Sequence, residues 1–330
     1  MNTMLMPLFT APTIEFSALA PILIVFGAAC IGVLVDAIMI GRLRGWRDEV
    51  QMGLVIGSTL GAFAYVVWNA RKGVKGPLAM GSIMLDGPTY VAWGALLVFG
   101  LLAIMVFRET KVNGGVTAFA SSAATVPGSA EEVEADRYRL QQTEIFPLAL
   151  FSIVGMMVFA SANDLLTLFV GLEVFSLPLY LMCGMARRRR LVSQEASLKY
   201  FLLGALSSAF FLFGVALVYA YAGSFKLGDI ATKMASPTYG SGLLYTGLIL
   251  LASGLRLLLG PLIALGLVVL LGLSGLTRQV AIVQSAMPTA VVTGVLASEF
   301  GADTEFVTAT ILVSTVTSVA TLTILLAVIM

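Results

Sequence analysis

Long apolar runs separated by short polar segments divide the first 225 residues of this chain. A helix needs about 20 mostly apolar residues to cross the hydrocarbon core of a bilayer. Five runs meet this length, at residues 18–40, 50–69, 88–107, 164–185 and 197–222, and a sixth, shorter run lies at 145–161. Pro147 near the start of the sixth run and the polar segment 161–164 at its end mark its limits. The pattern therefore predicts six transmembrane helices in this region.

The hydrophobic pattern changes after residue 240. The run 243–273 is interrupted by Gly254, Arg256 and the Gly260-Pro261 pair, and this predicts a break or tight bend between Ser253 and Pro261. The run 279–299 has Pro288 at its middle, which is typical of a kinked helix lining a substrate cavity, although proline is also common in purely structural membrane helices. A threonine-rich helix is expected from 304 to 330, with hydroxyls bonded to carbonyls one turn back. The predicted fold class is an all-α polytopic membrane protein of about eight or nine spans.

Composition and charge limit the possible functions. Apolar side chains make up 59% of the 330 residues and charged ones 11%, with a mean hydropathy of +0.99, which excludes a soluble globular domain. The net charge of +1 leaves no basic surplus for binding nucleic acid. The sequence contains no histidine, so histidine-ligated metals and Ser-His-Asp triads are excluded.

The basic residues predict an orientation, because Lys and Arg accumulate in cytoplasmic loops. Loops after the first, third and fifth predicted helices hold eleven of them, including the run Arg187 to Arg190, and the loops on the other side hold five. The amino terminus is therefore expected outside a bacterial inner membrane. The segment 108–144, rich in Gly, Ser and acidic residues, is expected to be a mobile cytoplasmic loop.

Glu173 is the first candidate for a functional residue. It lies nine positions after Asp164 and fourteen before Arg187, which places it near the middle of the membrane. A carboxylate at this depth is costly unless it is paired or hydrated, so Glu173 is expected to face the helix bundle. The structural alternative is a neutral Glu173 that is hydrogen-bonded inside the bundle, with Ser176 as a neighbour.

Lys199 is the second candidate. It lies four residues after Glu195, a spacing that predicts an ion pair on one helix face near the cytoplasmic surface. Lys199 is interpreted either as an interface residue or as a member of a proton relay. A direct bridge to Glu173 is not expected, because the two residues differ in depth.

Two stretches carry a family resemblance. They read NDLLTLFVGLEVFSLPLYLMCGMARRRR and SQEASLKYFLLGALSSAFFLFGVALVYAYAG. Residues 1 to about 254 resemble the amino-terminal part of subunit N of bacterial, actinobacterial-type NADH-quinone oxidoreductase, respiratory complex I. That family looks like cation/proton antiporters and contributes to proton translocation coupled to quinone reduction.

The resemblance implies that Glu173 and Lys199 lie in a proton path. It also implies that the chain itself binds no cofactor or metal, since NADH, FMN, iron-sulfur clusters and quinone belong to other subunits. The expected surroundings are the lipid bilayer and other membrane subunits of complex I, and at most the chain is a non-redox subunit of an NADH:quinone oxidoreductase. The family's lysine and Pro-Phe-His motif on a broken helix are missing, so the channel is expected to be truncated and incomplete.

Residues from about 255 to 330 resemble the carboxy-terminal helices of the auxin efflux carrier family. Pro288 matches that family's helix crossover, although the asparagine that usually follows is absent. The sequence is therefore divided into a subunit N-like region, 1–240, and an auxin efflux carrier-like region, 241–330. Besides the complex I subunit, two alternatives remain: a secondary transporter of small organic anions, and a non-functional hybrid of the two families.

Overall fold

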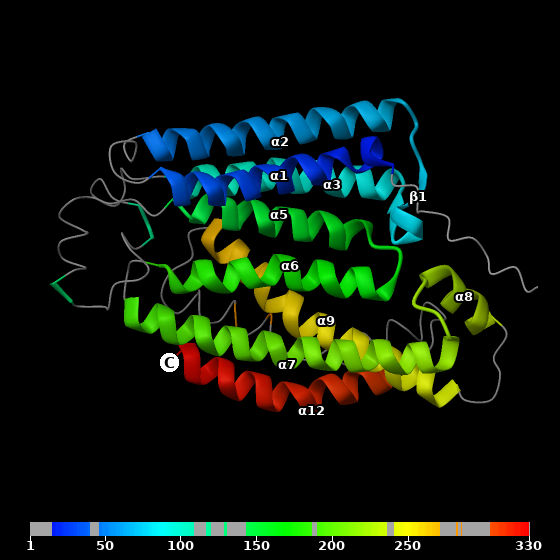
Figure 1. The fold of residues 1–330 in the computed structure, drawn as a ribbon. Coiled ribbons are helices and arrows are strands. Elements are labelled where there is room, and N and C mark those ends of the chain that lie inside the picture. The colour runs from blue at the N-terminus through cyan, green and yellow to red at the C-terminus, as the bar shows by residue number, and fades with distance from the viewer. Residues whose placement is uncertain are drawn as a thin grey trace, which may run out of the picture.

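Helices dominate the computed structural model of the protein (Figure 1). The structure describes residues 15–39, 46–108, 117–119, 129–130, 143–186, 190–235, 241–270, 282, 285 and 304–329. Within these ranges the helices are α1 (Phe16–Ile38), α2 (Arg47–Arg71), α3 (Gly87–Phe107), α5 (Ile145–Ser161), α6 (Leu165–Gly184), α7 (Arg190–Ala222), α8 (Leu227–Ala235), α9 (Ser241–Leu270) and α12 (Thr304–Ile329).

The structure has a helix at each of the six predicted positions, namely α1, α2, α3, α5, α6 and α7. The short run at 145–161 forms α5 with the predicted limits. Among the described residues, five helices are long and apolar enough to cross a membrane, and α5, α9 and α12 contain shorter apolar stretches. The all-α polytopic fold class is therefore confirmed.

Polar residues at helix starts set where α3 and α6 begin. The Asp86 carboxylate accepts a hydrogen bond from the Thr89 backbone N–H at 2.9 Å, and the first turn of α3 also holds Pro88. The Asp164 carboxylate accepts from both the backbone N–H and the hydroxyl of Thr167, each at 2.7 Å. These caps satisfy N–H groups that have no partner within the helix, so the position of α6 along its sequence is fixed.

The largest core cluster joins α1, α2, α3 and α5. The fully buried Trp93 of α3 donates its indole N–H to the Met157 carbonyl of α5 at 2.8 Å. Gln51 of α2, also fully buried, donates its amide to the Gly32 carbonyl of α1 at 2.7 Å. A buried polar group needs such a partner, because nothing else in the apolar interior replaces water.

A small hairpin, which the hydrophobic pattern did not predict, lies at the end of the bundle that also carries α8 (Figure 1). It consists of β1 (Gly76–Leu78) and β2 (Ile83–Leu85), paired antiparallel around the 3-10 turn η2 (Ala79–Gly81). Asn163, between α5 and α6, holds it: its backbone N–H donates to the Ser82 carbonyl and its side-chain amide to the Gly81 carbonyl, both at 2.8 Å.

The predicted break in the run 243–273 is wrong. Helix α9 continues from Ser241 through Gly254, Arg256 and Pro261 to Leu270. A break within the bilayer would leave backbone groups without partners, and the glycines serve helix packing instead. A side chain at Gly247 would come within 2.9 Å of the Gly214 carbonyl of α7, so Gly247 permits α9 to lie close along α7.

Helix α12 confirms the expected threonine pattern. The hydroxyls of Thr310, Thr315 and Thr317 each donate to the carbonyl four residues earlier, at 2.9, 2.6 and 2.8 Å. Pro288 and most of the expected mobile loop, 108–144, lie outside the described residues. Helix α9 begins just past the expected boundary at residue 240 and packs on α7, so the two expected regions share an interface.

Candidate functional site

Glu173 lies close to the middle of α6. It is eight residues after the first residue of the helix and eleven before the last, which puts it about 12 Å and 16 Å from the two ends. Its side chain is half-buried. The Asp164 cap, which fixes the start of α6, therefore also fixes the depth of Glu173.

The Glu173 carboxylate faces α7 rather than the lipid. The hydroxyl of Ser208, a buried residue of α7, donates a hydrogen bond to Glu173 Oε1. The prediction that Glu173 faces the bundle is confirmed in this respect. The predicted neighbour, Ser176, instead donates to the Glu173 backbone carbonyl at 3.3 Å.

Sequence reasoning missed Ser208. The available signal was the Ser207-Ser208 pair inside the long apolar run 197–222. Adjacent residues on a helix point about 100° apart, so the two hydroxyls point toward different neighbouring helices. Ser207 donates to the Gly254 carbonyl of α9 at 2.6 Å, while Ser208 reaches Glu173. The pair thus joins α7 to both α6 and α9 beside the carboxylate.

Apolar residues of α6 next to Glu173 pack against α9. Leu172 and Phe175 of α6 are buried and pack with Leu255 and Leu259 of α9. Towards α5, the Ser152 hydroxyl donates to the Phe175 carbonyl at 3.1 Å. The residues next to Glu173 are therefore packed against both α5 and α9.

Aromatic hydroxyls follow along the α6–α7 interface. Tyr180 of α6 is buried, and its ring packs edge-to-face on Tyr200 of α7 with centroids 4.8 Å apart. The Tyr180 hydroxyl occupies the space beside Gly204, where any side chain would clash with it. Within the described part of the chain, the buried Tyr200 hydroxyl has no hydrogen-bond partner.

Lys199 lies apart from Glu173. Its Nζ is 2.5 Å from Glu195 Oε1, which confirms the predicted i,i+4 ion pair. Lys199 is nine residues before Ser208 on α7, or about 14 Å along the helix axis. The structure therefore does not bring Lys199 into contact with the Glu173 carboxylate, and Tyr180 and Tyr200 lie along the intervening interface.

This arrangement suits proton binding. A carboxyl group that accepts a hydrogen bond from a hydroxyl can take up and release a proton, and hydroxyls can pass protons through hydrogen bonds. In the described part of the chain, no three His, Cys, Asp or Glu side chains cluster closely enough to hold a metal ion. Pro288, the expected cavity kink, is outside the described residues.

A helical bundle with a carboxylate held at mid-depth defines a polytopic membrane protein with an intramembrane ionisable site. The family model described as "NADH:quinone oxidoreductase/Mrp antiporter, TM" matches residues 162–329, which include Glu173 and Lys199. This chain belongs to that family of membrane proteins.

Relatives agree with the family match. NADH-quinone oxidoreductase subunit N of Cutibacterium acnes is 46% identical over 250 residues, covering 76% of this chain and 46% of the relative. The subunit N of Saccharopolyspora erythraea is 48% identical over 247 residues, covering 74% of this chain and 47% of the relative. The chain spans about half the length of the relatives that it matches.

Two solved structures share the fold. One is the membrane-bound sulfane sulfur reductase, an archaeal respiratory membrane complex, with a TM-score of 0.53 and 20% identity, covering 73% of this chain and 44% of that chain. The other is respiratory complex I from Thermus thermophilus with bound aureothin, with a TM-score of 0.50 and 22% identity, covering 81% and 62%.

The family match also bears on residues 255–330. The single family model runs through 162–329, across the expected join, so the resemblance to auxin efflux carriers is not supported. The hypotheses of an organic-anion transporter and of a hybrid of two families rested on that resemblance, so neither is supported.

Proposed function

We propose that this chain acts as a membrane subunit of a proton-translocating NADH:quinone oxidoreductase and contributes to proton translocation coupled to quinone reduction. The observation that carries the proposal is the Glu173 carboxylate, held at mid-depth of α6 by the Ser208 hydroxyl of α7. The subunit N relatives support the assignment to the complex. Intramembrane carboxylates facing a bundle interior mark proton or ion pathways in membrane proteins.

In this proposal Glu173 holds the transported proton and Ser208 positions its carboxyl group. Lys199 is a second member of the path, near the Glu195 end of α7. Because about 14 Å separates Lys199 from Ser208, water and the Tyr180 and Tyr200 hydroxyls would have to connect the two levels. NADH, FMN, iron-sulfur clusters and quinone would bind to other subunits.

The proposed location is the bacterial plasma membrane, with the amino terminus outside. The arginine-rich segment before α7 would then face the cytoplasm, and the hairpin with Asn163 would face outward. The partners would be the other membrane subunits of the complex.

The test compares proton transfer with electron transfer in the assembled complex. A Glu173→Gln change keeps the size of the side chain and its ability to accept from Ser208, but removes the titratable proton. We expect fewer protons moved per quinone reduced, because general acid–base groups act only when they can change protonation state. Glu49→Gln, which removes an exposed carboxylate of α2 that pairs with Arg108, is the matched control and should leave the ratio unchanged.

An unchanged proton-to-quinone ratio in a fully assembled Glu173→Gln complex would contradict the proposal.

A second measurement uses the chain alone in liposomes with an internal pH-sensitive dye under an imposed potential. We expect no proton uptake above empty vesicles, because the hydrogen-bond partner of Glu173 is a neutral hydroxyl that cannot drive proton release. In this isolated state Glu173→Gln should alter stability more than flux.

A further inference from the structure

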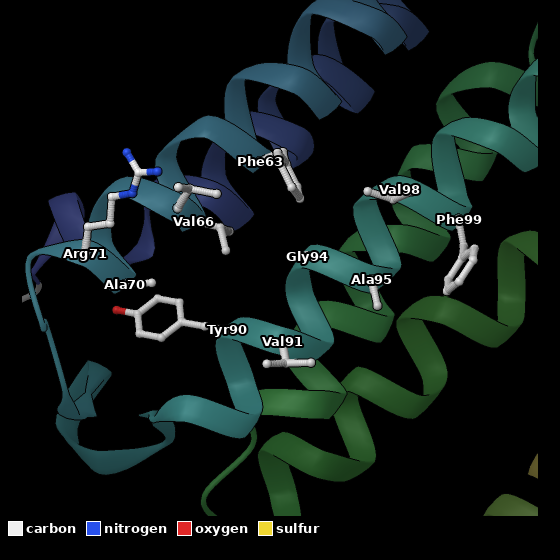
Figure 2. Close-up of a pocket in the computed structure, with 11 residues that line it drawn as sticks. Phe63, Val66, Ala70, Arg71, Tyr90, Val91, Gly94, Ala95, Val98 and Phe99 are labelled. Atoms are coloured by element: carbon white, nitrogen blue, oxygen red, sulfur yellow. The ribbon is translucent and has the colours of Figure 1, made fainter.

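An apolar groove of about 710 Å³ runs between α2 and α3 on the outer surface of the bundle (Figure 2). Valines and phenylalanines of both helices form most of its lining, and Arg71 borders one end. Phe99 lies at the other end and is 67% exposed. The groove therefore offers an occupant mainly hydrocarbon contacts, with one cation at its mouth.

The length of the groove matches one leaflet of a bilayer. Its lining on α3 extends from Tyr90 to Phe99, nine residues or about 14 Å along the helix. The hydrocarbon core of a bilayer is about 30 Å thick, so the groove covers roughly half of it. A transmembrane helix of a neighbouring subunit would cross both leaflets, whereas an acyl chain extends through only one.

Positive charge gathers where the groove reaches the end of the bundle. Arg71, Lys72 and Lys75 are all exposed and lie within five positions of the sequence. The carboxylate of Asp86 lies near them and interacts electrostatically with Lys75. Within the described residues, no carboxylate forms an ion pair with Arg71. These cations lie at the end of the bundle opposite the arginine-rich loops. Basic residues are uncommon on that side of a membrane, so a cluster of three there favours an anionic binding partner.

The mouth of the groove is held in place by contacts typical of a membrane interface. Lys72 Nζ lies 4.5 Å from the ring centre of the exposed Trp68, and the Tyr90 hydroxyl donates to the Val74 carbonyl at 2.7 Å. Trp and Tyr favour the headgroup level, because one part of each ring system is apolar and the other polar. The Tyr90 bond also ties the segment after α2 to α3, so the groove is preformed.

We propose that this groove binds one anionic phospholipid from the surrounding membrane. One acyl chain lies along Tyr90, Gly94 and Val98 of α3, and the headgroup phosphate pairs with the Arg71 guanidinium. Arginine suits this role because its planar group can donate two parallel hydrogen bonds to phosphate oxygens. Figure 2 shows Arg71 at the end of α2 and Gly94 in the middle of the groove, in the order that this placement requires.

The test measures phosphatidylglycerol bound to the delipidated full chain in detergent, by native mass spectrometry during a lipid titration. Arg71→Gln removes the cation, and we expect about tenfold weaker binding, because a charge-assisted hydrogen bond is lost. Gly94→Leu fills the groove, and its first carbon would make only ordinary contact, 3.6 Å from the Phe63 ring, so the helices can keep their positions. We expect this variant to lose the bound lipid.

Two control variants separate this site from general lipid contact. Gly61→Leu adds the same side chain to the lipid-facing side of α2, where no atom lies within 4 Å. Lys233→Gln removes an exposed cation of α8, at the same end of the bundle. Both controls should bind phosphatidylglycerol like the unchanged chain. Diacylglycerol, which has the acyl chains but no phosphate, should bind about tenfold more weakly to the unchanged chain.

Equal phosphatidylglycerol binding by Arg71→Gln, Gly94→Leu and the controls would overturn the proposal. A photoreactive benzophenone amino acid at Val91, which lines the groove and is 74% exposed, gives an independent result in native membranes. Crosslinking to phospholipid supports the proposal. Crosslinking to another polypeptide would show that a neighbouring subunit occupies the groove, and would overturn it.

Discussion

The contact between α5 and α6 beside Glu173 allows a quantitative prediction. A side-chain carbon at Gly155 of α5 would collide with the backbone nitrogen of Phe175 and lie 2.8 Å from its Cα. Optimal carbon contacts are about 3.5–4 Å, so the two helices would have to separate by about 1 Å. Because the opposing atoms belong to backbone, no side-chain rotation can relieve the collision.

We therefore expect Gly155→Ala to destabilise the protein. Overpacking costs about 1–3 kcal/mol, and replacing a helical glycine by alanine returns up to about 1 kcal/mol. The net loss should be about 1–2 kcal/mol. The matched change, Gly61→Ala on α2, places the same methyl group in open space, so it should stabilise the protein by about 0.5–1 kcal/mol.

The assay is reversible unfolding of the purified protein in mixed detergent micelles, followed by tryptophan fluorescence. The two alanine variants should differ by about 1.5–3 kcal/mol, with opposite signs relative to the unchanged protein. If Gly155→Ala proves as stable as Gly61→Ala, the close approach of α5 to α6 is wrong. The position of Glu173, two residues before Phe175, would then also need revision.

Two further predictions concern the polar groups at the hairpin end of the bundle. Asp86→Ala should cost about 1 kcal/mol at neutral pH, because it removes the cap of α3. Hydrogen bonds from the backbone and side chain of Thr89 hold the pKa of Asp86 below its ordinary value. The stability that the cap contributes is therefore fully present above the ordinary pKa and is lost as the pH falls through the lowered pKa. Unfolding of wild type and variant at pH 7 and at about pH 3 tests this, and an undiminished difference at low pH would contradict it. Asn163→Ala should cost about 1 kcal/mol by removing the side-chain hydrogen bond to the Gly81 carbonyl, and should speed limited proteolysis in the hairpin; cleavage at the wild-type rate would argue against this tie.

The membrane helices follow from the sequence because lipid leaves few options for the backbone. An apolar run of about 20 residues must satisfy its own N–H and C=O groups, so it forms a helix whatever its neighbours are. The limits of α5 could therefore be predicted from a polar segment and a proline. The same reasoning placed Glu173 at mid-depth, since depth depends only on the number of residues from the helix end.

The sequence-based prediction was wrong where a residue type can have either of two structural effects. Gly254 and Pro261 weaken an isolated helix, and they predicted a break in α9. In the structure, the Gly254 backbone carbonyl accepts from Ser207, and glycine lets α7 approach closely. Whether a glycine bends a helix or allows close packing depends on the partner helix, which hydrophobic periodicity does not identify.

The partner of Glu173 was decided only by tertiary structure. Ser208 is 35 residues further along the chain and lies on a different helix. The rotation of α7 about its own axis decides whether the Ser208 hydroxyl points to the carboxylate or to the lipid. That rotation depends on how α6, α7 and α9 pack. The sequence by itself determined that an ionisable group lies inside the membrane, because the spacing of residues fixes depth. The packing of the helices decided which side chain donates a hydrogen bond to this ionisable group, because the direction of a side chain is fixed only when neighbouring helix surfaces fit together.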